Sequence, residues 1–165
     1  EAVLNDITEW LDGNLADISN LVEMHYVGRP NELGNHVERL LMARLEEEMR
    51  FHVETPTTEH GRRQAAGYPD GVIFDLRRDT VVYFDVKIFQ EKTKDSTLRS
   101  FYYQPTNQNK ILHDAPHFLI AFKVKSLGDD NRSPFIIQGY EIVDIHSLQV
   151  NFKAEFNASN RDLYS

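Results

Sequence analysis

The pattern with the clearest chemical meaning is an aspartate and a lysine two residues apart, Asp85 and Lys87, inside the apolar run 81–89. Side chains alternate between the two faces of a β-strand, so these two residues share one face of the predicted strand. Burying both charges is costly unless they contact each other, a metal or a ligand. The pair is therefore either an exposed ion pair on an edge strand or part of a functional site.

A second carboxylate lies fifteen residues upstream, at Asp70. It follows Pro69, whose missing N–H suits the entrance to a strand, and a β-rich run over 71–77 begins directly after it. A short polar turn joins the two runs, which predicts an antiparallel hairpin with Asp70 and Asp85 on neighbouring strands. Two carboxylates converge to a few ångströms only where a cation separates them. This arrangement indicates an oxygen-rich site suited to Mg²⁺ or Mn²⁺.

The order Pro69-Asp70, a fifteen-residue gap and then Asp85-Val86-Lys87 resembles the PD-(D/E)xK nucleases, and more closely the type II restriction endonucleases. The resemblance implies a restriction-endonuclease-like α/β/α fold with a mixed central β-sheet. It also implies a metal-dependent deoxyribonuclease that hydrolyses phosphodiester bonds. In that family pattern Asp70 and Asp85 bind the metal and the main-chain carbonyl of Val86 is a third ligand. Lys87 holds or activates the attacking water.

Family members often carry an additional acid on the preceding helix, and Glu38 is the residue we expect in this role. It lies in the middle of the apolar stripe of its predicted helix, so its carboxylate points toward the protein. Glu48 lies near the same stripe, but Arg44 four residues before it offers an ordinary ion pair. Asp75 rivals Asp70 as the first metal ligand, but it is predicted at the far end of its strand, beside the turn.

The segment that follows the motif strand is rich in cations, hydroxyls, aromatic rings and amides. Lys, Arg, Ser and Thr suit phosphate oxygens, and amide side chains can pair with adenine edges in the major groove. The same composition is typical of a polar surface helix. Only the neighbouring acidic site favours a DNA-binding role for this segment. The predicted DNA-binding residues are Lys92, Lys94, Thr97, Arg99, Ser100, Tyr103, Gln104, Asn107, Gln108, Asn109 and Lys110.

The elements that must position these residues are predicted to form one domain over 1–165. A helical N-terminal part, 1–54, precedes the catalytic hairpin, 68–89, and further strands complete the sheet over 117–145. This order of helices and strands predicts the α/β class with a mixed sheet. The expected elements are one broken or two short helices over 5–27, interrupted at Gly13; a helix from Asn35 to about Phe51; a loop over 55–67; helices at 95–103 and 107–113; and strands at 117–125 and 134–145.

The net charge of −8 at first argues against a nucleic-acid partner. The acidic excess is local, however: residues 1–54 hold twelve Asp and Glu against four Arg, whereas residues 55–165 hold fourteen acids and fourteen bases. A locally positive face is therefore compatible with the acidic chain.

The chain has no cysteine, which excludes disulfides, thiolate zinc sites and a cysteine nucleophile and fits a reducing compartment. No apolar run reaches the length of a membrane span, so we expect a cytoplasmic protein without a membrane partner. The sequence opens at Glu1 without a signal-peptide pattern, and we expect some N-terminal sequence to be missing.

These observations favour a Mg²⁺-dependent, sequence-specific endonuclease of double-stranded DNA, a type II restriction enzyme of a restriction-modification system. A homodimer is expected, because each strand of a symmetric site then faces one active centre. A structure-specific or repair nuclease of the same fold is the first alternative. A catalytically silent DNA-binding domain is the second, and the intact Asp70, Asp85 and Lys87 argue against it.

Overall fold

The computed structural model describes residues 2–63, 67–94, 108–128 and 133–149 of the 165-residue chain. Two helices precede the five described strands, as expected from the order of the sequence patterns. The described elements are α1 (Ala2–His25), α2 (Pro30–Glu46), β1 (Phe51–Glu54), β2 (Gly71–Asp75), β3 (Thr80–Phe89), the 3₁₀ turn η1 (Glu91–Thr93), β4 (His117–Ser126), β5 (Phe135–Asp144) and the 3₁₀ turn η2 (Ile145–Ser147).

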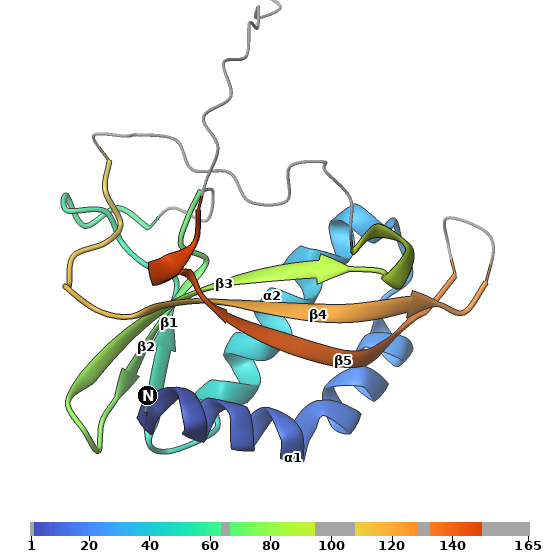
Figure 1. Ribbon diagram of the computed structural model, residues 1–165, viewed down its shortest axis with the longest axis horizontal. Coiled ribbons are helices and arrows are strands. Elements are labelled where there is room, and N and C mark those ends of the chain that lie inside the picture. Colours follow the sequence, from blue (N-terminus) through green and yellow to red (C-terminus); the bar gives the residue numbers. More distant parts are fainter. Residues whose placement is uncertain (1, 64–66, 95–107, 129–132, 150–165) are drawn as a thin grey trace, which may run out of the picture.

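The five strands form one sheet in the order β1-β2-β3-β4-β5 (Figure 1). Neighbouring strands are antiparallel except β3 and β4, which are parallel. A parallel pair needs a long crossover connection, and the chain between β3 and β4 is long enough to provide one. The α/β class with a mixed sheet, expected from the sequence, is confirmed.

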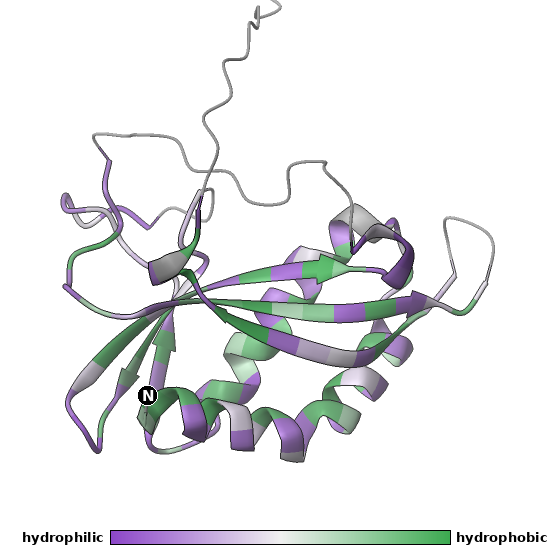
Figure 2. Cartoon of the chain, viewed as in Figure 1, coloured by the Kyte–Doolittle hydropathy of each residue, from purple (hydrophilic) through white to green (hydrophobic). Residues whose placement is uncertain are grey.

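Both described helices lie on one face of the sheet (Figure 1), with α1 against β5 and α2 against β1 and β3. Their apolar stripes face the strands, and Figure 2 shows hydrophilic residues on their outer sides. From β3, the side chains of Val82, Phe84 and Val86 enter this core. Because side chains alternate, Asp85 and Lys87 belong to the opposite face of the sheet. The expected helix at 95–103, which would cover that face, lies outside the described residues.

The predicted hairpin is confirmed. Gly71 pairs with Phe84 at one end of the β2–β3 ladder, and Asp75 pairs with Thr80 at the turn. Strand β2 begins at Gly71, whereas β3 continues to Phe89. Among the strands of the described residues, the second half of β3 therefore has no partner on the β2 side, and this free edge begins next to Asp70.

The helix boundaries differ from the expectation. The first helix runs through Gly13 without a break, because its buried apolar stripe continues on both sides, with Leu11 before the glycine and Ile18 after it. The second begins at Pro30 rather than Asn35, since proline is well suited to the first helical turn. It ends at Glu46 rather than near Phe51, and Phe51 opens strand β1, which the sequence analysis did not predict.

The helix expected at 107–113 is wrong for the described part of that segment, 108–113. Its main-chain N–H groups have other acceptors: those of Leu112 and His113 donate to the Tyr83 hydroxyl at 2.8 and 3.2 Å. No helix among the described residues has the length and apolar character needed to cross a membrane.

Candidate active site

Asp70 stands directly before β2 and faces the free edge of β3. Its main-chain N–H donates to the Phe84 carbonyl at 3.1 Å, and its carboxylate accepts from the Val86 N–H at 2.8 Å. In a strand the N–H and C=O of one residue point to the same edge, so the Val86 carbonyl also faces the side of Asp70. One carboxylate and one carbonyl oxygen thus lie together where β2 begins.

Asp85 is buried on β3, with 3% of its surface exposed, and forms an ion pair with Lys87. The Lys87 Nζ also lies 3.4 Å from the Val86 carbonyl oxygen. Burial and the nearby Asp70 carboxylate raise the pKa of Asp85, and Lys87 opposes this shift. The two carboxylates therefore face each other closely enough to repel, as the hairpin predicted.

Glu38 of α2 turns toward the same place. Burial raises the pKa of Glu38 to about 7, and the charges of Asp70 and Asp85 add to the shift. An isolated glutamate titrates near pH 4.3, so the site favours the protonated form of this carboxyl group up to a higher pH than usual. Glu38, the additional acid expected from the family resemblance, thus approaches Asp70 and Asp85 from a separate element, α2.

The donor chemistry of this cluster fits a hard divalent cation. Asp70, Asp85 and the Val86 carbonyl offer oxygen ligands. Burial, and next the negative charge of neighbouring carboxylates, raises the pKa values of Glu38 and Asp85. Across the described ranges, no three His, Asp or Glu side chains are close enough to hold an ion by themselves. The fitting ligand set is therefore two carboxylates and a main-chain carbonyl, with Glu38 farther out.

The structure separates the two rival acids from the cluster. Glu48 accepts a hydrogen bond from the Trp10 indole N–H at 2.9 Å, while Arg44 pairs with Glu47 instead. Asp75 is buried, and its carboxylate is held by two arginines, Arg78 at 2.7 Å and Arg50 at 3.2 Å. Both acids have structural partners away from Asp85.

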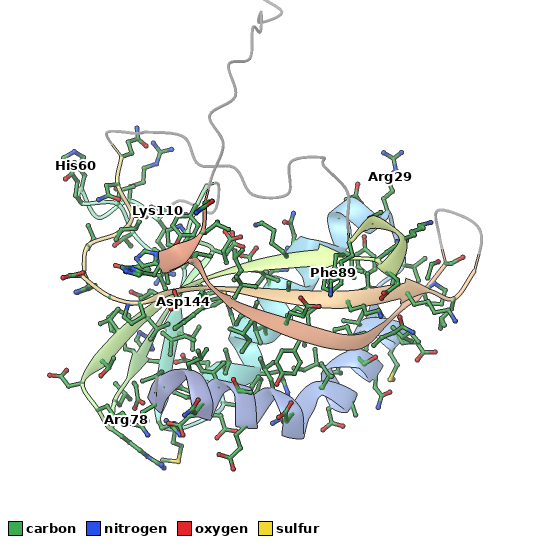
Figure 3. All side chains as sticks on the ribbon, viewed as in Figure 1. Arg29, His60, Arg78, Phe89, Lys110 and Asp144 are labelled. Carbon is green, nitrogen blue, oxygen red and sulfur yellow. The ribbon has the colours of Figure 1, made fainter. Side chains whose placement is uncertain are left out.

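The position of Lys110 differs from the expectation. The sequence analysis placed this residue on a DNA-facing surface, but only 4% of its surface is exposed. Its Nζ donates to the carbonyls of Gly67 and Pro69, and its charge interacts with the carboxylates of the site. Figure 3 labels Lys110. Burial lowers the pKa of Lys110, an effect that these carboxylates oppose. No local sequence pattern predicts that Lys110 is buried, because its two carbonyl partners lie more than forty positions away in the chain.

Four other residues of the predicted DNA-binding set are described. Lys92 is exposed on η1, and Lys94 is paired with Glu141 at 2.6 Å. Gln108 is exposed, and the Asn109 side chain bonds locally to the main chain of Ile111 at 2.9 and 3.0 Å. The remaining residues of the set, Thr97, Arg99, Ser100, Tyr103, Gln104 and Asn107, lie outside the described residues.

A groove of about 490 Å³ extends from Lys87 along the free edge of β3. Its walls come from β3, from η1 and from Gly34 of α2. Lys87 and Lys92 give this groove two cationic side chains. Its walls also carry the apolar side chains of Val86, Ile88 and Phe89, so the two lysines stand on a mixed surface.

The comparisons with known proteins agree with this geometry. The family model described as "Type II restriction enzyme MjaV family" matches residues 1–165. The chain is similar to the type II restriction enzyme MjaV of Methanocaldococcus jannaschii, with 38% identity over 143 residues that cover 82% of this chain and 60% of the relative. The chain thus spans about 60% of the length of the curated relative that it matches.

Proposed function

The chain belongs to the type II restriction enzyme MjaV family, and from this premise we propose that it is a Mg²⁺-dependent endonuclease that cuts double-stranded DNA at a specific sequence. The observation that carries the proposal is the convergence of Asp70, Asp85 and Lys87 at the start of β2. The name of the relative supports the same substrate class. The roles that follow are those the geometry supports best.

The carboxylates of Asp70 and Asp85 and the carbonyl of Val86 would hold Mg²⁺, with Mn²⁺ as an alternative. When bound, this cation supplies positive charge to the phosphate in the transition state and lowers the pKa of water. Lys87 is placed beside the same oxygens, so its ammonium group orients the attacking water and stabilises the charge that develops on the phosphate.

Glu38 supplies a proton acceptor. A general base works best when its pKa lies near the working pH, and the pKa of Glu38 is raised to about 7. Its deprotonated form takes the proton of the attacking water, and its half-buried position keeps this carboxyl group beside Asp70 and Asp85. Glu38 is therefore the third acid of the proposed site.

The DNA backbone is proposed to enter along the groove beside β3. Lys92 faces solvent there and offers its ammonium group to a phosphate. Lys94 reaches a phosphate only after it leaves Glu141. Lys110 is removed from this set, since its burial and its carbonyl partners keep its charge inside the protein.

A homodimer is the simplest assembly for the proposed reaction. Each chain carries one site, and a symmetric duplex sequence presents two scissile phosphates related by a two-fold axis. Sedimentation of the protein with a short duplex and Ca²⁺ tests this part, and a mass of two chains per duplex is the expected result.

The proposed function is tested by incubating the protein with a long phage-sized duplex and Mg²⁺. A sequence-specific enzyme gives discrete fragments, and EDTA abolishes them. Cleavage of branched but not linear DNA would indicate a structure-specific nuclease instead. The absence of any cleavage with Mg²⁺ or Mn²⁺, on linear or branched DNA, would contradict the nuclease proposal.

A further inference from the structure

We propose that Lys110 is a positioning residue that holds Asp70 in its place beside β3. The catalytic meaning of this role rests on the proposed nuclease function, whereas the role itself rests on contacts among described residues. Lys110 reaches the site from the segment that precedes β4, far along the chain from the acids it serves.

The contacts of Lys110 fix the loop that carries Asp70. Its Nζ donates to the carbonyl oxygens of Gly67 at 2.5 Å and Pro69 at 2.7 Å. These two carbonyls lie on either side of Tyr68, and Asp70 follows directly. One ammonium group therefore holds both ends of the short turn from which Asp70 projects.

A second contact holds the same turn from another direction. The Tyr68 hydroxyl contacts Nδ1 of His117, at the start of β4, and the two rings stack with centroids 5.7 Å apart. Two residues thus anchor the loop: Lys110 binds the main-chain carbonyls of the loop, and His117 contacts the side chain of Tyr68. The regular ladder of β2 begins only at Gly71, and Asp70 adds one main-chain bond to it, so these anchors hold the side of the turn that the ladder does not reach.

The burial of Lys110 argues for positioning over the other roles of a lysine. A phosphate contact needs an exposed ammonium group, and this residue is 4% exposed. A buried ammonium is costly unless it is hydrogen-bonded and faces negative charge. Here it has two carbonyl acceptors and interacts with the charges of Asp70, Asp85 and Glu38. A residue that only filled space would not need this charge.

The Val86 amide reports directly on this role, because its acceptor is the Asp70 carboxylate. In the Lys110→Met variant without metal, we expect the Val86 amide to exchange with deuterium at least about tenfold faster, while amides within the β2–β3 ladder keep their protection. We also expect Ca²⁺ affinity, measured by calorimetry, to fall by about 10- to 100-fold, as for residues that orient metal ligands.

Lys125→Met is the matched control, since Lys125 is an exposed lysine at the end of β4. It should leave Val86 exchange and Ca²⁺ affinity unchanged. If Lys110→Met does not fold, Lys110→Gln replaces it, because the amide keeps a donor for one carbonyl; smaller changes of both quantities are then expected. A folded Lys110 variant with wild-type Val86 exchange and wild-type Ca²⁺ affinity would overturn the proposal.

If Lys110 only competed with the cation for the site, the change in Ca²⁺ affinity would have the opposite sign. Removing its charge would then tighten Ca²⁺ binding without exposing the Val86 amide, and this result would also overturn the positioning role. Neither measurement uses DNA or cleavage. A wild-type protein that fails to cut DNA would therefore contradict the proposed function alone and leave the role of Lys110 to these two readouts.

Discussion

The Asp70 carboxylate accepts a 2.8 Å hydrogen bond from the main-chain N–H of Val86, sixteen positions later on the neighbouring strand. The bond forms where β2 has not yet begun, so a side chain takes the place of a main-chain acceptor. The Val86 carbonyl is on the same edge and has no β2 partner there. The start of β2 thus brings together one carboxylate and one carbonyl, next to the buried Asp85.

This arrangement depends on the residue after Asp70. A Cβ added at Gly71 would lie 2.1 Å from the Phe84 ring, and Phe84 is buried with 1% exposure. We predict that Gly71→Ala lowers the free energy of unfolding by roughly 1–3 kcal/mol, because the ring or the strand entrance must move. It should also weaken Ca²⁺ binding, which calorimetry measures, since Asp70 shifts with the strand entrance.

Gly139→Ala on β5 is the control for this substitution, because nothing lies within 4 Å of the added methyl group. It should bind Ca²⁺ like the wild type. A Gly71→Ala variant that is as stable as Gly139→Ala and binds Ca²⁺ equally well would show that the Phe84 ring does not fix the strand entrance.

The charge of Glu38 should destabilise the metal-free protein above neutral pH. Its pKa is raised to about 7 in the folded state and lies near 4.3 when unfolded, so between these values the folded state binds the additional proton. The contribution of protonated Glu38 to the free energy of unfolding is therefore fully present below about pH 4. It is lost as the pH rises through about 7. We predict that Glu38→Gln raises the free energy of unfolding by roughly 1–3 kcal/mol at pH 8 and much less at pH 5.

Urea unfolding at the two pH values, in EDTA, measures this difference. Glu32→Gln, an exposed glutamate of the same helix, is the matched control and should show little change at either pH. A Glu38→Gln variant whose stability relative to wild type does not depend on pH would mean that Glu38 does not face the carboxylates of the site.

Lys87 should matter for the reaction more than for metal binding. We predict that Lys87→Met lowers the single-turnover cleavage rate by at least about 100-fold, because the ammonium group acts on water and phosphate. Ca²⁺ affinity should survive, since the oxygen ligands stay in place. Removing the partner of a buried carboxylate costs stability, so the metal-free variant should melt earlier and recover when Ca²⁺ is added.

The comparison with Lys123→Met separates this effect from a general loss of positive charge. Lys123 lies on β4 and pairs with Glu91. If Lys87→Met cleaves DNA as fast as Lys123→Met, the role assigned to Lys87 is wrong.

Lys92 should contact phosphate through the groove. Losing one phosphate contact reduces the slope of log affinity against log salt by about 0.9. We predict this change for Lys92→Ala in fluorescence anisotropy with Ca²⁺ present, and no change for Arg44→Ala on the helical face. Binding by the wild type should be stronger with Ca²⁺ than with EDTA, because the cation screens the site carboxylates. Equal salt slopes for wild type and Lys92→Ala would place the DNA elsewhere.

The local parts of this site were predictable from the sequence. Alternation over 81–89, a proline before a strand and a short turn are all features of neighbouring residues, and they predicted the hairpin that brings Asp70 to Asp85. The sheet class followed for the same reason. The family resemblance suggested Glu38 as the additional acid, and helical spacing predicted that its carboxylate points toward the protein; the residue is partly buried on α2. Its role and those of Asp70, Asp85 and Lys87 stay predictions.

What the sequence could not predict depends on long-range contacts. Lys110 was indistinguishable from a surface lysine, because its partners at Gly67 and Pro69 lie more than forty positions away. Strand β1 has only four residues and follows directly on a helical pattern. It forms because Phe51 and Val53 are buried when β1 pairs with β2, which no local pattern shows.

The central claim is that Asp70 and Asp85 belong to the centre that cuts DNA. The most direct measurement is the single-turnover cleavage rate of a duplex with a mapped site, for the wild type and for Asp85→Asn, with circular dichroism to verify the fold. We predict that the wild type cleaves with Mg²⁺ and that Asp85→Asn is folded but at least about 1,000-fold slower, because a ligand of the required cation is lost. A folded Asp85→Asn variant that cleaves at the wild-type rate would contradict this assignment.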